Sequence, residues 1–208
     1  MMKKYRIDIN IVDNQKMFSE GLAEALNRSD ILRVSRTFTT LEACRQALQE
    51  RCPDVLLLDI LMPDGDGISF CRQVVSDYPK VKVVAVTIHD EYSVVQRMLE
   101  AGVHGYVLKS SSVSTLIEAI VNVWQGGHYV SAEVNSILQR GQLQAISLTT
   151  VEQSVLRLVC DGFTNPEIAV KLSLSTETIN WYRKRLLAKF GVRNTVLLVK
   201  QALKEMLV

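Results

Sequence analysis

The chain has 208 residues, which is enough for one large domain or for two small ones. Apolar residues make up 48% of the chain, which excludes a disordered protein, and the net charge of +2 indicates no particular partner. The charge is unevenly distributed, however, because residues 1–147 hold 15 basic and 17 acidic side chains whereas residues 148–208 hold 9 and 5. Only the second part is therefore expected to meet a polyanion.

Membrane spans and metal-binding cysteine motifs are not expected. The first apolar run, Ile7–Val12, is short and is broken by Asp8 and Asn10, so the sequence predicts neither a signal peptide nor a membrane helix. We therefore expect a cytoplasmic protein. Cysteines occur at positions 44, 52, 71 and 160, and no two have the spacing of a zinc or redox site. Reduced, mostly buried thiols are expected.

The first 127 residues alternate short apolar runs with helical patterns. Strands are predicted at residues 7–12, 33–38, 55–58, 81–88 and 105–108. Helices are predicted after them, at residues 18–26, 41–50, 67–78, 92–101 and 113–124. This order predicts an α/β doubly wound fold with a five-stranded parallel sheet.

Polar residues end four of these predicted strands: Asp13, Asp59, Thr87 and Lys109. Ligands of doubly wound sheets bind beyond the carboxyl ends of the strands, which is where all four fall. The Asp59 carboxylate could attack phosphorus and form an acyl phosphate. The Lys109 ammonium and a Mg²⁺ ion held by carboxylates would offset the charge of the phosphoryl oxygens. Thr87 offers a hydroxyl to the new phosphoryl group.

Five short segments of this region resemble the motifs of the receiver domain of response regulators: Ile11–Asp13, Leu58–Pro63, Asp66–Gly67, Ala85–Thr87 and Gly105–Lys109. The resemblance covers about residues 5–127 and implies a flavodoxin-like receiver that a sensor histidine kinase phosphorylates at Asp59. It also implies that Asp13, Asp59 and the backbone carbonyl of Leu61 hold Mg²⁺. Thr87 and Tyr106 would form a switch pair that moves when the phosphoryl group arrives.

One residue departs from the receiver pattern. Receivers usually carry two adjacent acids after the first strand, but here Asp13 is followed by Asn14. An amide oxygen can bind Mg²⁺ but brings no charge, so the sequence predicts weak Mg²⁺ binding and slow phosphorylation, or another form of control. A further hypothesis places the Lys16 ammonium near the acids, where it would partly replace the metal.

The remainder of the chain is predicted to be a linker and a helical domain. Residues 128–147 show no strand pattern, and we interpret them as a linker with one short helix at residues 131–140. Helices are then predicted to begin at or just after Thr149, Thr164, Ser175 and Thr195. Thr149 with Glu152 has the spacing of a capping box.

The third of these helices is basic and follows a tight turn, which predicts a helix-turn-helix. Four segments resemble the LuxR-type output domain over about residues 146–208: Leu148–Glu152, Asn165–Ala169, Leu174–Ile179 and Lys189–Val192. The resemblance implies that the third helix enters the major groove, with Asn180, Trp181 and Lys184 facing bases. Asn suits adenine and Lys suits guanine, whereas Trp181 could touch thymine methyls or pack under the neighbouring helix. Phosphate contacts are expected from Arg183, Arg185 and Lys189.

The domain order resembles the NarL/FixJ-type response regulators. It implies a receiver domain at residues 1–127, a linker at 128–147 and a DNA-binding domain at 148–208. The protein is then a transcription factor that binds double-stranded DNA, as a homodimer through its last helix or its receiver. One alternative is a regulator that binds DNA independently of phosphorylation, because of Asn14. A second is a phosphatase-like phosphotransferase, but Leu61 stands where its general acid would be needed, so we expect no enzyme.

Overall fold

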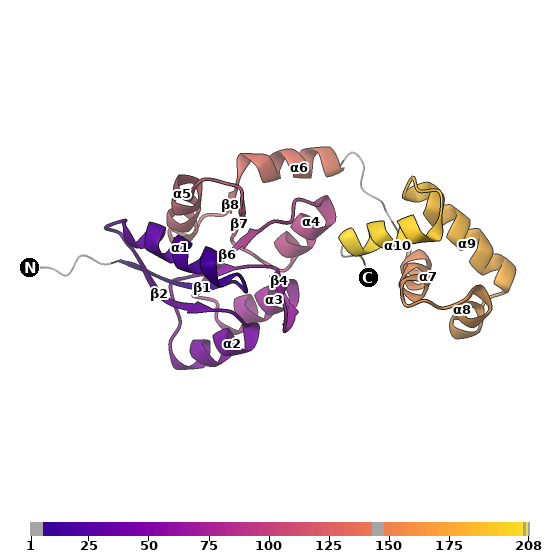
Figure 1. Ribbon diagram of the computed structural model, residues 1–208, viewed down its shortest axis with the longest axis horizontal. Helices are drawn as coiled ribbons and strands as arrows, with labels where there is room; N and C mark the ends of the chain where they lie inside the picture. The colour runs from indigo at the N-terminus through magenta and orange to yellow at the C-terminus, as the bar shows by residue number, and fades with distance from the viewer. Residues whose placement is uncertain (1–5, 143–147, 206, 208) are drawn as a thin grey trace, which may run out of the picture. The chain divides into compact units, whose positions relative to one another are not determined.

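The computed structural model describes residues 6–142, 148–205 and 207. The chain forms two compact units, one within residues 1–139 and one that includes residues 140–208 (Figure 1). Across the described ranges, every helix is too short or too polar to span a bilayer.

The first unit is built on a six-stranded parallel sheet with the strand order β2-β1-β3-β6-β7-β8. Its strands are β1 (Ile7–Val12), β2 (Leu32–Phe38), β3 (Val55–Leu58), β6 (Lys82–Thr87), β7 (Gly105–Leu108) and β8 (Tyr129–Val130). A short antiparallel pair, β4 (Leu61–Met62) with β5 (Gly65–Asp66), follows β3. All four residues of β3 are buried, since β1 and β6 flank it and helices cover both faces, which explains its unbroken apolar sequence.

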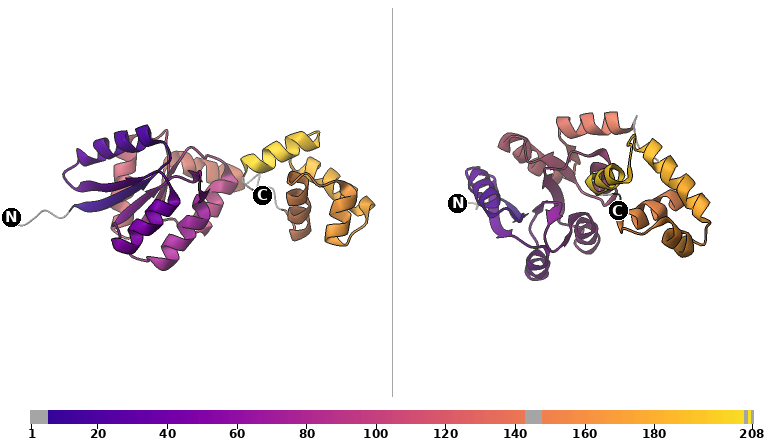
Figure 2. Two further views of the ribbon diagram at one scale, coloured as in Figure 1. Left: turned by 60° about the horizontal axis from the view of Figure 1, so that its bottom comes forward. Right: turned by 45° about the vertical axis from the view of Figure 1, so that its right-hand side comes forward.

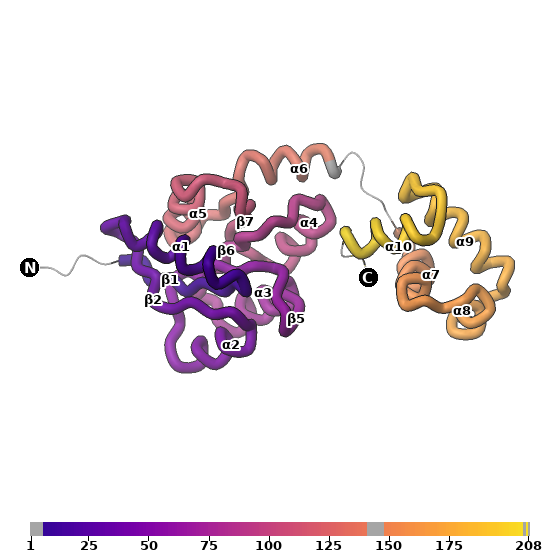
Figure 3. Tube along the Cα trace, viewed as in Figure 1, coloured from indigo at the N-terminus to yellow at the C-terminus, as the bar shows by residue number. Residues whose placement is uncertain are grey.

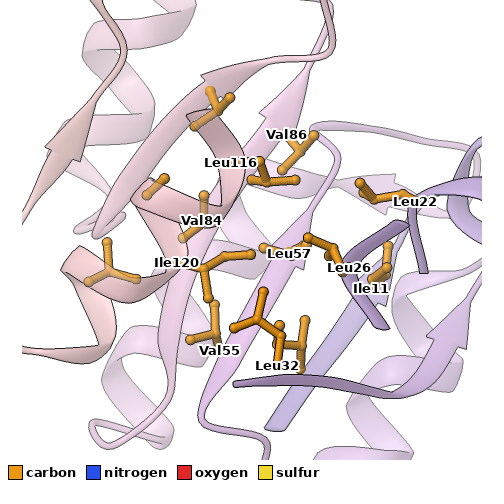
Figure 4. Packing of buried hydrophobic residues seen from close by; sticks show 14 of the residues in the cluster. Ile11, Leu22, Leu26, Leu32, Val55, Leu57, Val84, Val86, Leu116 and Ile120 are labelled. Carbon is orange, nitrogen blue, oxygen red and sulfur yellow. The ribbon is translucent and has the colours of Figure 1, made fainter. Parts of the chain in front are cut away.

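Helices cover the two faces of this sheet (Figures 1 and 2). The helices between β1 and residue 142 are α1 (Lys16–Asn27), α2 (Leu41–Glu50), α3 (Gly67–Asp77), α4 (Tyr92–Glu100), α5 (Val113–Trp124) and α6 (Ala132–Gln142), of which α6 follows β8 and does not cover the sheet. Leu22 and Leu26 of α1 and Ile120 of α5 pack on the same face of the strands, against residues such as Leu57 and Val84 (Figure 4). Helices α2 and α3 cover the opposite face, so the predicted doubly wound class is confirmed.

The sixth strand corrects the sequence analysis, which expected five strands and no strand within residues 128–147. Tyr129 and Val130 pair in parallel with Gly105 and Tyr106 of β7. A two-residue strand is too short to show a periodic pattern, which is why the sequence did not reveal it. The expected short helix is present as α6, whereas residues 143–147 of the predicted linker lie outside the described residues.

The second unit contains four helices, traced in Figure 3: α7 (Thr150–Cys160), α8 (Asn165–Leu172), α9 (Thr176–Lys189) and α10 (Thr195–Lys204). The predicted capping box is confirmed, since the Thr149 hydroxyl accepts the Glu152 N–H and the Glu152 carboxylate accepts the Thr149 N–H. Ser175 caps α9 by accepting the N–H of Thr178 at 3.1 Å. Buried residues from all four helices share one small core, including Leu156, Ile168, Ile179, Leu186 and Leu198.

The four cysteines are free thiols. Cys44 and Cys71 are buried, and burial raises the pKa of each thiol to about 12, which keeps both protonated. Cys160 is half-buried and Cys52 is exposed. The expectation of mostly buried thiols therefore holds for two of the four.

Candidate functional site

Three parallel strands end at the same edge of the sheet and bring two carboxylates to one ammonium. Asp13 follows β1, Asp59 follows β3 and Lys109 follows β7. The Lys109 Nζ lies 2.7 Å from Asp13 Oδ2 and 2.8 Å from Asp59 Oδ2. The side chains of Asp13, Asp59 and Lys109 are only 3%, 4% and 7% exposed, so water screens their interaction weakly. We call these three residues the strand-end cluster.

Backbone groups hold the two remaining carboxylate oxygens. Asp13 Oδ1 accepts the N–H of Gln15 at 2.8 Å, and Asp59 Oδ1 accepts the N–H of Leu61 at 3.3 Å. The Lys109 ammonium also lies 4.6 Å from the centroid of the Phe18 ring, a cation–π contact. Each carboxylate is thus fixed on one side by the backbone and on the other by the ammonium. The cluster keeps a formal charge of one negative unit, which favours a further cation.

The two residues expected to form a switch pair contact the same backbone segment. Thr87 ends β6, is fully buried, and its hydroxyl accepts the N–H of His89 at 3.4 Å. Tyr106 of β7 is also fully buried, and its hydroxyl donates to the carbonyl oxygen of His89 at 3.0 Å. A displacement of the Thr87 hydroxyl would therefore release a restraint on the segment that follows β6.

Mg²⁺ prefers oxygen ligands such as carboxylates, so Asp13 and Asp59 are suitable residue types to bind this ion. Among the described residues, however, no third acidic, histidine or cysteine side chain joins them to form a metal-binding group. Asn14 is exposed on the segment after β1, and Leu61 begins β4 directly after the Asp59 turn. Lys16 does not support the hypothesis made for it, because its side chain is 77% exposed and pairs with Glu20 at 3.7 Å.

The loop that carries Asp59 is held by two further acids and one glycine. Asp64 accepts the N–H groups of Leu41 and Glu42 at the start of α2, both at 3.0 Å. Asp66 caps α3, because its carboxylate accepts the N–H groups of Ile68 and Ser69. A Cβ on Gly67 would lie 2.7 Å from the carbonyl oxygen of Ile60 and 2.9 Å from that of Asp59. The close approach of helix α3 to the Asp59 backbone therefore requires glycine at this position.

Replacing Gly67 with alanine is expected to destabilise the first unit by about 1–3 kcal/mol, the usual cost of overpacking. The new methyl group meets backbone atoms that can yield only by moving Asp59. Calorimetry of the full chain would show a lower unfolding temperature. Gly21→Ala is the matched control, because a Cβ there meets nothing within 4 Å and alanine favours a helix. A Gly67→Ala protein as stable as the Gly21→Ala protein would contradict this geometry.

In the second unit, helix α9 presents a polar and basic surface. Asn180, Lys184 and Arg185 are exposed, and the Trp181 side chain is 52% exposed. The Trp181 ring meets Tyr182 edge-on at 4.9 Å, and the Arg185 guanidinium lies 5.1 Å above it. Of the two roles considered for Trp181, this exposure favours contact with a ligand over packing beneath a neighbouring helix.

The three residues expected at phosphates also hold the second unit together. Arg183 donates to the side chain of Asn165 at 2.6 Å and to the Thr195 hydroxyl at 3.0 Å, joining α8 and α10 to α9. The Asn165 amide also donates to the side chain of Asn180, one of the expected base-facing residues. These bonds give Arg183 and Asn180 a fixed orientation in the free protein.

Glu152 is a charged residue whose second role the sequence analysis missed. Its side chain is fully buried and lies 3.0 Å from Arg185 Nε and 2.7 Å from Lys189 Nζ. The hydrogen bond from Lys189 and that from the Thr149 N–H lower the pKa of Glu152 to about 2. The sequence revealed the local partner, Thr149, but not the two partners on α9. The buried carboxylate of Glu152 therefore neutralises part of the positive charge of α9.

The lowered pKa of Glu152 predicts a pH dependence for the second unit. Because the folded pKa lies below the ordinary value of 4.5, its stabilising effect is complete above about pH 4.5 and is lost as the pH falls towards about 2. The protection factors of the Leu156 and Leu186 amides in the full chain, which compare measured exchange with the intrinsic rate at each pH, should fall as the pH decreases from about 4.5 towards about 2. Glu152→Gln should show a smaller pH dependence there. Equal profiles for both proteins would argue against the ion pairs.

Comparison with known proteins agrees with this architecture. Residues 9–121 match the family model of the response regulator receiver domain. Residues 146–202 match that of the bacterial regulatory proteins of the luxR family. The chain therefore belongs to the response regulators of the NarL/FixJ type, which join a receiver domain to a LuxR-type DNA-binding domain.

The relatives are similar over nearly the whole chain. VraR of Staphylococcus saprophyticus is 33% identical over 97% of this chain and 99% of its own length. DegU of Brevibacillus brevis is 29% identical over 96% of this chain and 94% of its own length. Among solved structures, RcsB of Salmonella enterica serovar Typhimurium is 25% identical over 97% of this chain and 99% of its own, with a TM-score of 0.77. That structure has RcsB bound to the promoter P1flhDC in the presence of the phosphomimetic BeF3-. A second structure shows two RcsB dimers bound to two parallel DNAs. It has a TM-score of 0.75 and 26% identity over 94% of this chain and 96% of the RcsB chain.

Proposed function

We propose that this response regulator is a cytoplasmic transcription factor whose hold on double-stranded DNA is governed by phosphorylation of Asp59. The observation that carries the proposal is the strand-end cluster, which presents a fixed carboxylate beside a buried ammonium. An Asp59 oxygen attacks the phosphorus of a phosphohistidine on a sensor histidine kinase. A P–O bond forms, the P–N bond breaks, and the imidazole leaves with the electron pair.

The residues around Asp59 have separate roles in this transfer. Lys109 offsets the negative charge of the phosphoryl oxygens and can do so without reorganisation, because it already lies 2.8 Å from Asp59. The Thr87 hydroxyl exchanges the His89 N–H for a phosphoryl oxygen, and Tyr106 follows through its own bond to His89. Leu61, two residues after Asp59, has no proton to give, so the site lacks the general acid of a phosphatase.

Mg²⁺ would be held by Asp13, Asp59 and the Leu61 carbonyl, with a weak contribution from the Asn14 amide. When bound, it supplies positive charge opposite the phosphoryl oxygens. Because Asn14 is neutral, the site offers two carboxylates where receivers usually offer three, and one of the two charges is already balanced by Lys109. Affinity for the ion is therefore weak, and phosphorylation is slow.

Asn14→Asp is expected to strengthen Mg²⁺ binding about tenfold, or by about 1.4 kcal/mol, because it adds a negative charge beside the cation. Titration with MgCl₂, followed by NMR of the full chain, measures the change. Asn14→Ala is the control, and it should bind within about twofold of the natural protein. Equal and tight binding by the natural protein and Asn14→Asp would contradict the assigned role of residue 14.

The DNA-binding surface is proposed to be the exposed face of α9, placed in the major groove. Asn180 would read adenine, Lys184 guanine, and Trp181 the methyl groups of thymine. Contacts to phosphates would come from Arg183, Arg185 and Lys189. Support comes from the exposure of Asn180, Lys184 and Arg185 on this face and from the LuxR-type family match.

A homodimer is the proposed DNA-binding state. Helix α10 carries Val196 and Leu203, which are 77% and 57% exposed, so it offers an apolar contact to a second copy. The receiver domain is the other surface expected to take part. RcsB, a structural relative, binds DNA as dimers. A two-fold dimer requires inverted half-sites about 10 base pairs apart.

Two α9 substitutions should have different effects on DNA binding. Lys184→Ala should remove the preference for one G·C pair, at a cost of about 1–3 kcal/mol on the preferred sequence only. Arg185→Ala should weaken binding to all sequences alike and lower the slope of log affinity against log salt by about 1. Binding to pools of randomised duplexes at several salt concentrations separates the two. Indistinguishable profiles would remove Lys184 from the base-reading set.

Phosphorylation itself is tested by intact mass measurement. The full chain, incubated with Mg²⁺ and acetyl phosphate or a phosphorylated histidine kinase, should gain one phosphoryl group, and Asp59→Asn should gain none. DNA binding without any mass gain would favour the alternative that Asn14 suggests, a regulator independent of phosphorylation. Continuous release of phosphate from a small phosphoester would favour a phosphotransferase instead.

A further inference from the structure

A polar cavity of about 240 Å³ opens beside the edge strand β2, between β1 and the segment that follows α2. Side chains alternate along a strand, so Asp8 and Asn10 of β1 point away from the face on which Ile9 and Ile11 join the apolar core. The cavity is lined by Asp8, Asn10, Ser35, Arg36, Arg51 and Cys52. No residue of the strand-end cluster lines it, so it is distinct from the site at which phosphorylation is proposed.

A β-bulge in β2 shapes one wall of this cavity. Ile9 pairs with Val34 and Asn10 pairs with Arg36, so Ser35 is an extra residue in β2. Successive residues of a regular strand face opposite sides of the sheet. The bulge allows Ser35 and Arg36 to line the same cavity although they are neighbours in the sequence. The Ser35 hydroxyl donates to the carboxylate of Asp8, which fixes this wall.

Asn10 gives the cavity its most specific chemical feature. Its side chain is only 3% exposed, and its amide makes no hydrogen bond to any residue of the described ranges. The amide atoms are not fully enclosed, and Asn10 forms part of the cavity wall, so the amide can be reached from the cavity. A buried amide without a partner is costly. A second amide in the cavity would satisfy both its donor and its acceptor.

The charged groups of the wall favour a carboxylate. Asp8 accepts hydrogen bonds from Arg33 at 3.4 Å and from Arg51 at 2.9 Å, so its own charge is compensated. Arg36 donates to Glu50 at 3.0 Å. Each guanidinium carries several further N–H donors, so the wall offers more donors than acceptors to a ligand. A planar carboxylate is the group that guanidinium donors bind best.

We propose that this cavity binds a small molecule that carries one carboxylate and one amide and is about the size of N-acetylglycine. The carboxylate meets the guanidinium groups of Arg36 and Arg51, and the amide exchanges hydrogen bonds with the amide of Asn10. A volume of about 240 Å³ corresponds to about eight water molecules of about 30 Å³ each, and N-acetylglycine has eight non-hydrogen atoms. This binding site goes beyond the function proposed above.

Three substitutions separate binding from folding. Asn10→Leu removes the amide at a similar volume, so it should weaken N-acetylglycine about five- to tenfold without lowering the unfolding temperature. Arg36→Gln removes one guanidinium of the wall and should weaken the same probe about tenfold. Arg33→Gln is the matched control, because Arg33 has the same charge and also pairs with Asp8 but does not line the cavity. Its affinity should stay within about twofold of that of the natural protein.

Cys52 reports whether the cavity is occupied, because its side chain is exposed and forms part of the wall. NMR titration of the full chain gives the dissociation constant of N-acetylglycine. At ten times that concentration, alkylation of Cys52 by iodoacetamide should slow about tenfold, as mass action requires. Mass spectrometry of the digested protein measures the rate at each cysteine. Cys160 on α7 is the internal control, and its rate should not change.

Two further probes test the chemistry of the ligand. Pentanoate lacks the amide and N-acetylglycinamide lacks the charge, so each should bind at least about fivefold more weakly than N-acetylglycine. In Asn10→Leu, pentanoate and N-acetylglycine should bind equally.

Three results would overturn the proposal. The first is that no probe binds or protects Cys52, in which case water alone fills the cavity. The second is equal affinity of N-acetylglycine for the natural protein and for Asn10→Leu. The third is that inorganic phosphate binds the natural protein as tightly as N-acetylglycine does, which would make the cavity a site for anions in general. None of these readouts depends on phosphorylation, so they do not share an outcome with the test of Asp59.

Discussion

The placement of one ammonium between two buried carboxylates is the constraint on which the first unit depends. Without Lys109, Asp13 and Asp59 would be like charges held out of water at the same sheet edge, a costly arrangement. The parallel strand order makes the cluster possible, because β1, β3 and β7 all end on one side. In the proposed transfer, the same ammonium would meet the incoming phosphoryl group.

In the second unit, too, a buried acid is paired with basic side chains. Glu152 lies buried beneath α9 and pairs with Arg185 and Lys189, so part of the basic surface serves the fold before any DNA arrives. Arg183 likewise ties α8 and α10 to α9 through Asn165 and Thr195. These contacts limit the motion of the long basic side chains, and a preorganised surface loses less entropy on binding.

Much of the fold followed from sequence because β3, β6 and β7 are apolar runs and because α2, α5, α7 and α9 begin with capping residues. Strand β8 did not, since Tyr129 and Val130 are too few to show a period. The meeting of Asp59 with Lys109 was predictable because both residues end strands of one parallel sheet, whereas the hypothesis that placed Lys16 near the acids was wrong, since Lys16 pairs with Glu20. The ion pairs of Glu152 and the cavity beside Asn10 arise from packing between distant segments, which no local pattern encodes.

In the proposed function, the phosphorylation state of Asp59 decides whether the protein binds DNA. The most direct measurement is selection of duplexes from a random pool by the full chain, with and without a phosphoryl donor, in parallel with Asp59→Ala. We expect the natural protein to select an inverted repeat with higher affinity when the donor is present, and Asp59→Ala to show no response to the donor. Selection that is unchanged by the donor in the natural protein, or an identical response by Asp59→Ala, would contradict the account.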